Sequence, residues 1–208
     1  MDNNKRLIWL GGQLVPVTEA KVNVLSPTSQ FGANVFEGIR CYWNADEQQL
    51  YAFRLDDHYR RLHQSIKLMR FNSPYSTEDF RQGLIDVVKA NGYREDIAVR
   101  QTVFIDGLGG TWSSREPVNM FIAPIPKGRT LAEGKKGLRC QVSSWERISD
   151  RDLSPRAKVG ANYPRDGTPL ERDGILHRGI CDVEEEPRNA RKSLRNSWNM
   201  KRLPFPFH

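Results

Sequence analysis

The sequence predicts an α+β fold, because strand-like runs and two amphipathic helical stretches follow one another without regular alternation. Regular alternation of strand and helix would instead favour a doubly wound parallel sheet. The chain has 208 residues, enough for one or two domains, and its hydrophobic content of 38% supports a buried core. We therefore expect a small mixed domain with a sheet and helices packed on it.

The region before the first helix has the pattern of a hairpin, a loop and two further strands. Gly11 and Gly12 separate two short runs and supply the hairpin turn. A stretch with Ser, Pro and Gly predicts the loop, and a polar segment separates the two later strands. The predicted strands are residues 7–10, 13–17, 35–43 and 49–53, with the loop at 26–32.

Two helices are predicted from the spacing of apolar residues. In residues 55–69 the apolar positions recur three and four residues apart and line one face. The helix at 77–90 follows Ser76, which forms a capping-box pattern with Asp79, and it ends at Gly92. The apolar stripes are Tyr59, Leu62, Ile66 and Met69 in the first helix and Phe80, Leu84, Val87 and Val88 in the second.

The chain after the second helix predicts further strands and one long loop. Residues 97–105 are mostly apolar and predict a buried strand. The loop 106–117 contains Gly and Ser and is long enough to be functional. Residues 118–125 and 138–145 predict the next two strands, and the second of these leads into a segment that contains Lys158.

The last 45 residues differ in composition from the rest. Residues 164–208 contain nine Lys or Arg and seven Asp or Glu, and they hold five of the 12 prolines. No helical or strand period persists there for more than a few residues. Such a segment buries too little apolar area to offset its ordering entropy, so we expect it to be weakly ordered or disordered.

Composition argues against several classes of protein and site. The 32 basic residues are interspersed with 25 acidic ones, so the net charge of +7 includes no long basic run of the kind that binds nucleic acid. No apolar run reaches the roughly 18 residues of a membrane helix, and the apolar run 7–10 is too short for a signal peptide. Three scattered cysteines indicate reduced thiols and no metal site. We expect a soluble, cytoplasmic protein with no nucleic-acid or membrane partner.

Two distant segments carry residues suited to one kind of chemistry. Lys158 lies among small residues that leave room for a flat ring, and Tyr163 follows five positions later. Far upstream, residues 35–40 read Val-Phe-Glu-Gly-Ile-Arg, in which a glycine turn would present an arginine. Together these segments resemble the fold-type IV pyridoxal-phosphate enzymes, and most closely the branched-chain amino-acid aminotransferases. The resemblance extends over residues 6–163.

The resemblance implies a domain plan, a cofactor and a reaction. The chain would comprise the small N-terminal α/β domain of a fold-type IV aminotransferase, followed by the beginning of the large domain. The cofactor would be pyridoxal 5′-phosphate, and the reaction would transfer an amino group between a branched-chain or similar L-amino acid and a 2-oxo acid. Family members are usually dimers, so a homodimer is expected. The expected segments are the small domain 1–124, a linker 125–136, the start of the large domain 137–163 and a divergent tail 164–208.

The resemblance also assigns roles to cofactor-binding residues. Lys158 would form the Schiff base and later move the proton during transamination. Tyr163 matches the tyrosine that hydrogen-bonds the phenolate oxygen of the cofactor. Arg61 matches the arginine that binds the phosphate, for which a planar guanidinium is well suited.

On the substrate side, the resemblance implies a pocket wall and two carboxylate-binding residues. Phe36 matches the wall of the side-chain pocket, and Arg40 and Arg100 match arginines near the substrate carboxylate. Three tyrosines of the family are replaced in this sequence, by Phe31, Ala98 and Thr130. Each replacement removes a hydroxyl that would help to place a carboxylate, so the choice of substrate stays open.

The resemblance ends just after Tyr163. Downstream of the lysine the family has a glutamate that pairs with the protonated pyridine nitrogen, whereas this sequence reads Arg191-Lys192-Ser193 there. We expect an out-of-frame tail or a gene truncation to produce so abrupt a change. One alternative is a catalytically inactive remnant or interaction module. Another is a different fold-type IV enzyme, a D-amino-acid aminotransferase or an aminodeoxychorismate lyase, against which residues 36–40 argue.

Overall fold

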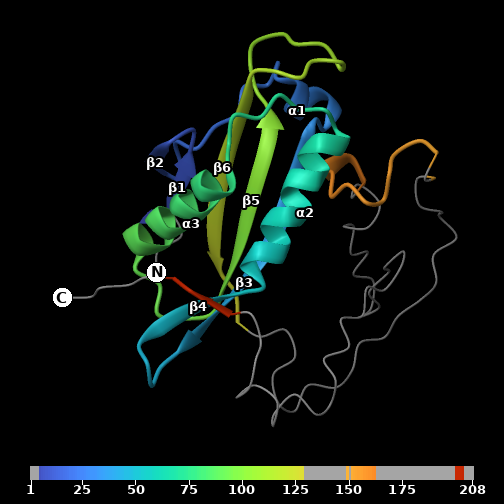
Figure 1. The fold of residues 1–208 in the computed structure, drawn as a ribbon. Coiled ribbons are helices and arrows are strands. Elements are labelled where there is room, and N and C mark those ends of the chain that lie inside the picture. The colour runs from blue at the N-terminus through green and yellow to red at the C-terminus, as the bar shows by residue number, and fades with distance from the viewer. Residues whose placement is uncertain (1–4, 129–148, 150, 163–199, 204–208) are drawn as a thin grey trace, which may run out of the picture.

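One antiparallel sheet covered on one face by two helices forms the body of the protein (Figure 1). A computed structural model describes residues 5–128, 149, 151–162 and 200–203. Within these residues the sheet has seven strands in the order β2-β1-β6-β5-β3-β4-β7. The antiparallel sheet with helices on it confirms the α+β fold class predicted from the sequence.

The strands and helices lie close to most of the predicted ranges. The strands are β1 (Leu7–Leu10), β2 (Gln13–Pro16), β3 (Asn34–Asn44), β4 (Gln49–Phe53), β5 (Ile97–Ile105), β6 (Val118–Pro126) and β7 (Met200–Arg202). The helices are α1 (Pro27–Phe31), α2 (Leu55–Leu68) and α3 (Thr77–Asn91), and a 3-10 turn spans Gly160–Asn162.

The ends of the two long helices follow from local chemistry. The predicted capping box is present, since the Asp79 backbone N–H donates to Ser76 Oγ and the Ser76 N–H donates to the Asp79 carboxylate at 2.7 Å. Gly92 ends α3 in the left-handed conformation, with φ of 63°. The first turn of α2 contains Asp56 and Asp57, whose negative charges complement the positive end of the helix dipole.

The helix α1 replaces the loop predicted at 26–32. Ser26 caps its start by accepting a hydrogen bond from the Ser29 backbone N–H, and Pro27 has a backbone angle already suited to a first helical position. Gly32 ends it with φ of 66°, a conformation that other residues adopt only under strain. A helix of one turn has too few residues for a detectable apolar period, and the sequence therefore predicted a loop there.

The strand β7 differs from the expectation that residues 164–208 lack regular structure. Met200–Arg202 pair in an antiparallel manner with β4. Leu203 is buried, and its carbonyl oxygen accepts a hydrogen bond from Gln49 Nε2. The edge of β4 offers unpaired backbone groups that a short extended segment can bind without any sequence period.

Several predicted segments lie wholly or partly outside the described residues. β6 continues to Pro126, which is two residues into the expected linker. The remaining segments outside the described residues are most of the linker, the predicted strand 138–145, and the tail residues 164–199 and 204–208.

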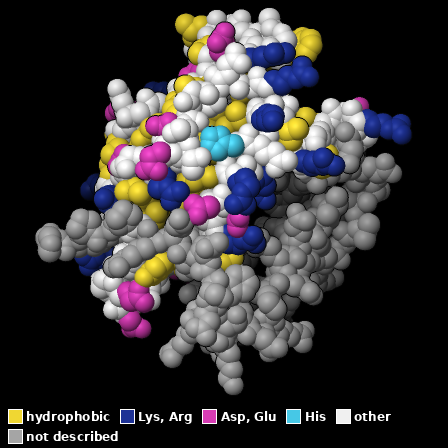
Figure 2. All heavy atoms as spheres, in the orientation of Figure 1, with side chains coloured by type: hydrophobic (Ala, Val, Ile, Leu, Met, Phe, Trp, Pro, Cys, Tyr) yellow, Lys and Arg dark blue, Asp and Glu magenta, His cyan; other side chains and the backbone are white. Residues whose placement is uncertain are grey.

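The hydrophobic core lies between the helices and the sheet. α2 packs against β3, and α3 packs against β1 and β6 (Figure 1). Core residues that come from the predicted apolar stripes are Tyr59, Leu62, Ile66, Phe80, Leu84, Val87 and Val88, with Met69 partly buried against them. On the outer face of the helices, Lys and Arg side chains alternate with Asp and Glu (Figure 2). In the described part of the chain, the helices are too short or too polar to cross a membrane.

Candidate active site

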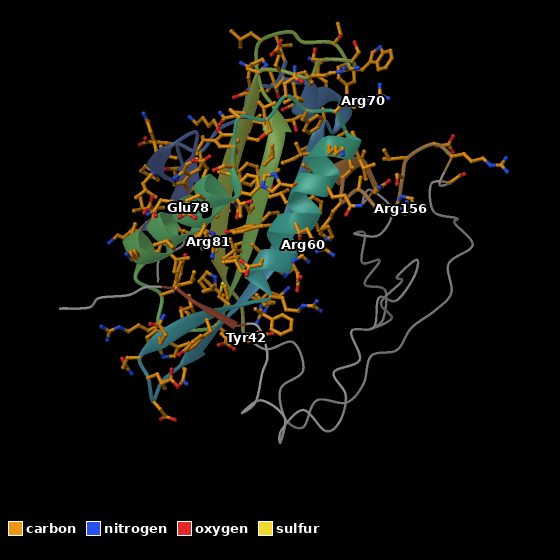
Figure 3. All side chains as sticks on the ribbon, viewed as in Figure 1. Tyr42, Arg60, Arg70, Glu78, Arg81 and Arg156 are labelled. Atoms are coloured by element: carbon orange, nitrogen blue, oxygen red, sulfur yellow. The ribbon has the colours of Figure 1, made fainter. Side chains whose placement is uncertain are left out.

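The segment that contains Lys158 is docked between β3 and α2. The Phe36 backbone N–H donates to the Lys158 carbonyl at 3.0 Å, and Val35 forms an antiparallel bridge with Val159. The Lys158 N–H donates at 3.0 Å to Ser65 Oγ, which lies on α2. Figure 3 shows the segment beside α2, marked by the label of Arg156. The backbone of Lys158 is therefore fixed on both sides by elements far away in the sequence.

Small residues let this segment approach β3 and α1 closely. A Cβ added to Gly160 would lie 2.4 Å from Asn34 Oδ1, which is closer than real Cβ atoms come to any neighbour. A Cβ added to Gly32 would lie 3.4 Å from the Cβ of Ala161. The sequence led us to expect small residues that make room for a flat ring. The contacts of Gly160 give a further reason, since it permits close packing on Asn34.

Two cationic side chains meet at the ring of Phe36. The Lys158 Nζ lies 5.0 Å from the centroid of this ring, and the Arg100 Cζ lies 5.2 Å from it. Phe36 and Arg100 share a sheet face because Gly38 pairs with Arg100 in the β3–β5 register and side chains alternate along a strand. Each cation–π contact contributes about 0.5–1 kcal/mol at an exposed site. The arrangement combines an amine, a guanidinium and an aromatic wall, which suits an anionic ligand with an apolar side chain.

Arg40 lies on the same sheet face, two strand repeats along β3 from Phe36. Its Nη2 donates to the Gly128 carbonyl at 3.1 Å, and its Cζ lies 5.5 Å from the centroid of the Tyr42 ring. Arg40 Nη1 and Thr102 Oγ1 are buried without a hydrogen-bond partner among the described residues. Thr102 pairs with Phe36 in the sheet. Buried polar atoms of this kind are rare, because each costs about 1–3 kcal/mol, and they indicate a place for a polar ligand atom.

Arg61 forms a bidentate ion pair with the buried carboxylate of Glu37. Its Nε donates to Glu37 Oε1 at 2.5 Å and its Nη2 donates to Oε2 at 2.6 Å. The Glu37 side chain is 0% exposed, whereas that of Arg61 is 48% exposed. His58 Nδ1 lies 2.8 Å from Glu37 Oε2. Glu37 faces α2 while its neighbour Phe36 faces the opposite side of the sheet, as strand alternation requires.

Glu37 stays charged in this environment. Burial by itself raises the pKa of the carboxyl, but hydrogen bonds from Arg61 and His58 and the charges of both groups lower it by more. The pKa of Glu37 is therefore below its ordinary value, because its charged form is better satisfied than its neutral form.

The structure brings together only some of the site residues predicted from the sequence. Lys158 and Arg100 converge on the ring of Phe36, and Arg40 lies nearby on the same sheet face. Arg61 of α2 pairs with Glu37 of β3. Tyr163 is outside the described residues.

The glycine turn expected in residues 35–40 is wrong. Gly38 lies inside β3, in an extended strand that pairs with β5. A Cβ at Gly38 would have no described atom within 4 Å. Strand alternation, and not a turn, places Phe36 and Arg40 on the same face.

Sequence reasoning missed the residues that support the site. Glu37 alternates with the apolar residues Val35 and Ile39, a pattern that predicts an inward carboxylate in need of a cationic partner. Ser65 is fully buried and accepts from the Lys158 backbone, but no local pattern marks a serine for that contact. In the described residues, no cluster of three or more His, Cys, Asp or Glu could hold a metal ion.

Two surface hollows formed by described residues lie elsewhere. One is lined by Asn23, by the start of the loop 106–117 and by the first residues of β6, and another by residues of the β1–β2 turn and α3. Neither contains Lys158, Phe36 or Arg100. The candidate site is therefore identified by its side chains and their contacts.

Comparison with known proteins reveals close relatives. The family model described as "Amino-transferase class IV" matches residues 34–166, more than half of the chain. The branched-chain-amino-acid aminotransferase of Escherichia coli is 34% identical over 160 residues, which cover 75% of this chain and 51% of that protein. This chain spans about half the length of the curated relatives it matches.

Solved structures agree with this relationship. The branched-chain aminotransferase of the archaeon Thermoproteus uzoniensis is 38% identical with a TM-score of 0.70, covering 76% of this chain and 52% of that one. The branched-chain aminotransferase of Thermobaculum terrenum is 36% identical with a TM-score of 0.68, covering 78% of this chain and 53% of that one. The sequence matches and the shared fold lead to one conclusion: the chain belongs to the class IV aminotransferases.

Proposed function

We propose that this chain forms part of the active site of a pyridoxal-phosphate-dependent aminotransferase. Its reaction would move an amino group between a branched-chain or similar L-amino acid and a 2-oxo acid. The convergence of Lys158 and Arg100 on the Phe36 ring carries the proposal. The relatives named branched-chain aminotransferases support the substrate class. Because the chain spans about half of their length, the complete reaction is itself part of the proposal.

The residues present fit pyridoxal phosphate. The Thermobaculum terrenum relative is described in a pyridoxal-phosphate form. In this chain Lys158 offers a primary amine and Arg61 offers a guanidinium for a phosphate. Arg40 Nη1 and Thr102 Oγ1, which have no hydrogen-bond partner within the described part of the chain, suit polar ligand atoms. When bound, the cofactor draws electrons away from the Cα of the amino acid.

The residues of the chain would bind and orient the cofactor and the substrate, and one of them would move a proton. Lys158 would hold the cofactor through its amine and then exchange a proton at its Nζ. Phe36 would pack against the apolar side chain of the substrate, while Arg100 and Arg40 would bind its carboxylate. Tyr163 would donate a hydrogen bond to the phenolate oxygen of the cofactor. Positioning of this kind contributes to catalysis because the reacting groups no longer have to find each other.

Reductive trapping tests the proposal. The purified chain is incubated with pyridoxal phosphate, reduced with borohydride, digested and examined by mass spectrometry. We expect a stoichiometric pyridoxyl adduct on Lys158. The exposed lysines Lys67 and Lys89 serve as internal controls, since each lies in the last turn of its helix with an exposed side chain. Scattered labelling, with these lysines modified as much as Lys158, would contradict the proposal.

A second candidate function is that of a catalytically inactive remnant. The sequence observation in its favour is the stretch Arg191-Lys192-Ser193, which lacks the carboxylate that the family uses at the ring nitrogen. A chain that is trapped at Lys158 but shows no transamination in single-turnover assays would support the remnant. Transamination with L- but not D-amino acids would separate the proposed activity from that of a D-amino-acid aminotransferase.

We further propose that the protein is a cytoplasmic homodimer. In support, an exposed apolar patch brings together two loops, since the Gly109 N–H donates to the Leu25 carbonyl at 3.3 Å. Val24, Leu108 and Trp112 are 77%, 81% and 78% exposed, and clustered exposed apolar side chains mark interaction surfaces. Light scattering should give the mass of a dimer for the parent chain and a lower mass for the Leu108→Ser, Trp112→Ser double variant. A monomeric parent chain would overturn this proposal.

A further inference from the structure

We infer that Glu37 is a positioning residue that fixes the orientation of Arg61 toward the phosphate of the cofactor. The inference rests on the proposed function, because it requires pyridoxal phosphate to bind at this site. It assigns to a buried carboxylate, which would not itself touch the cofactor, control over how one arginine binds a phosphate.

The pair has the geometry of a clamp. The carboxylate of Glu37 is 0% exposed and lies on β3, a central strand, whereas the Arg61 side chain is 48% exposed on the surface of α2. An exposed arginine ordinarily samples many rotamers, and ordering it costs free energy when a ligand binds. Two parallel hydrogen bonds of 2.5 and 2.6 Å hold the guanidinium in one plane before any ligand arrives.

The contacts of Glu37 use only one edge of the guanidinium. Glu37 accepts from Nε and Nη2, and the Nη1 edge is not part of this pair. A guanidinium has five N–H donors in a rigid plane, so one edge can bind a carboxylate while another is directed at a phosphate. Fixing the first edge therefore fixes the direction of the second.

The carboxylate is itself held in place. His58 Nδ1 lies 2.8 Å from Glu37 Oε2 and 3.5 Å from Arg61 Nη2. The side chains of Glu37, Arg61 and His58 therefore form a cluster in which each contacts the other two. Glu37 remains charged because these partners outweigh the effect of burial on its pKa. A fixed, charged acceptor is what a positioning residue needs.

The clamp is connected to the lysine segment through the same two elements. Arg61 and Ser65 lie four residues apart and thus on one face of α2, and Ser65 Oγ accepts from the Lys158 N–H. On β3, Phe36 binds the Lys158 carbonyl while the next residue, Glu37, binds Arg61. The structure therefore couples the anchor of the amine to the anchor of the phosphate-binding arginine.

A second physical effect of Glu37 on phosphate binding has the opposite sign. A carboxylate next to an arginine neutralises part of its charge and competes with a phosphate for its N–H groups. Under that reading, removing the charge of Glu37 would tighten phosphate binding. The two readings predict opposite signs, so one substitution decides between them.

The experiment compares two probes that differ only by the phosphate. Dissociation constants of pyridoxal 5′-phosphate and pyridoxal are measured by absorbance and fluorescence for the 208-residue chain and for Glu37→Gln. Loss of arginine pre-organisation should weaken pyridoxal phosphate by roughly 3- to 10-fold, with pyridoxal unchanged. The matched control is Asp57→Asn, since Asp57 is likewise a carboxylate with two basic partners, Arg54 and Arg60, but it is partly exposed.

Further variants separate positioning from a general effect on the fold. In the Arg61→Ala background, Glu37→Gln should not change the ratio of the two dissociation constants any further. His58→Asn should weaken pyridoxal phosphate in the same direction by a smaller factor, and it serves in place of Glu37→Gln if circular dichroism shows that variant unfolded. Tighter binding of pyridoxal phosphate, equal weakening of both probes, or no change in the ratio would each overturn the inference.

Failure of the proposed function is distinguishable from failure of this inference. A parent chain that binds neither probe refutes the proposed function and, with it, the role of Glu37. A parent chain that prefers pyridoxal phosphate over pyridoxal, with the same preference in Glu37→Gln and His58→Asn, refutes the positioning role alone.

Discussion

Replacing Gly160 by Ala should weaken the docking of the lysine segment on β3. The added Cβ would lie 2.4 Å from Asn34 Oδ1 and 2.9 Å from Asn34 Nδ2. Asn34 is not free to move without loss, since its Nδ2 donates to Thr28 Oγ1 at 3.2 Å. Either the asparagine or the segment has to shift.

The two ways of relieving the clash set the magnitude. If Asn34 rotates away, the protein loses its hydrogen bond to Thr28, which is worth about 0.5–1.5 kcal/mol. If the segment moves, the hydrogen bonds of Lys158 to Phe36 and Ser65 are both weakened, and the loss is about 1–3 kcal/mol. The costs of the two routes overlap at about 1 kcal/mol, so both Asn34 and the segment shift in part; we expect a loss of about 1 kcal/mol and a melting temperature about 2–4 °C lower.

Thermal unfolding followed by circular dichroism, together with trapping at Lys158, measures both consequences. Gly38→Ala is the matched control, because it adds the same methyl group to β3 where no described atom lies within 4 Å. Adding Asn34→Ala to Gly160→Ala removes the clash and should restore trapping. A Gly160→Ala variant as stable and as readily trapped as the parent chain would refute the close approach of the two segments.

Ser65→Ala should lower the yield of adduct at Lys158 and destabilise the fold by about 1 kcal/mol, because the Lys158 N–H loses its acceptor. Trapping measures the first effect and urea unfolding measures the second. The pKa of Glu37 is lowered in the folded state, so its charge contributes stability that is fully present above the ordinary value of 4.5 and is lost as the pH falls through the folded value. The urea concentration at the midpoint of unfolding should decrease as the pH is lowered through this acidic range, and it should decrease less steeply in Glu37→Gln. Burial raises the pKa of Cys41 to about 12, so iodoacetamide should modify Cys41 only after unfolding; rapid modification of the native protein would show that the core opens.

The long elements could be predicted from the sequence because each is specified locally. α3 has a capping box at Ser76 and a left-handed glycine at Gly92, and its apolar stripe repeats over several turns. By contrast, β7 exists through pairing with the edge of β4, and no property of Met200–Arg202 alone indicates such a partner. Local sequence signals thus predicted the long elements, and the main difference between the predicted and the observed strands comes from long-range pairing.

The candidate site divides in the same way. A resemblance to known enzymes could point to Lys158, Phe36 and Arg100, and the structure places these three around one ring. The resemblance carried no information about what holds them, so the contact of Ser65 with the Lys158 backbone and the clamp by Glu37 emerged only from the structure. Supporting residues act through geometry between distant segments, and a single sequence does not display that geometry.

The two faces of β3 carry the two groups of residues that the proposed cofactor site requires. Side chains at odd and even positions of the strand point to opposite sides of the sheet. Phe36 therefore contacts Lys158 and Arg100 on one side, while Glu37 binds Arg61 of α2 on the other. Both functions depend on the register of one strand, and that register is fixed by eight paired residues of β5. Under the proposed function, binding of the cofactor would therefore depend mainly on the described sheet and α2, whereas fast transamination would also need a charge at the ring nitrogen. On this argument, cofactor binding and catalysis are separable properties of the chain, and trapping at Lys158 measures the first without presupposing the second.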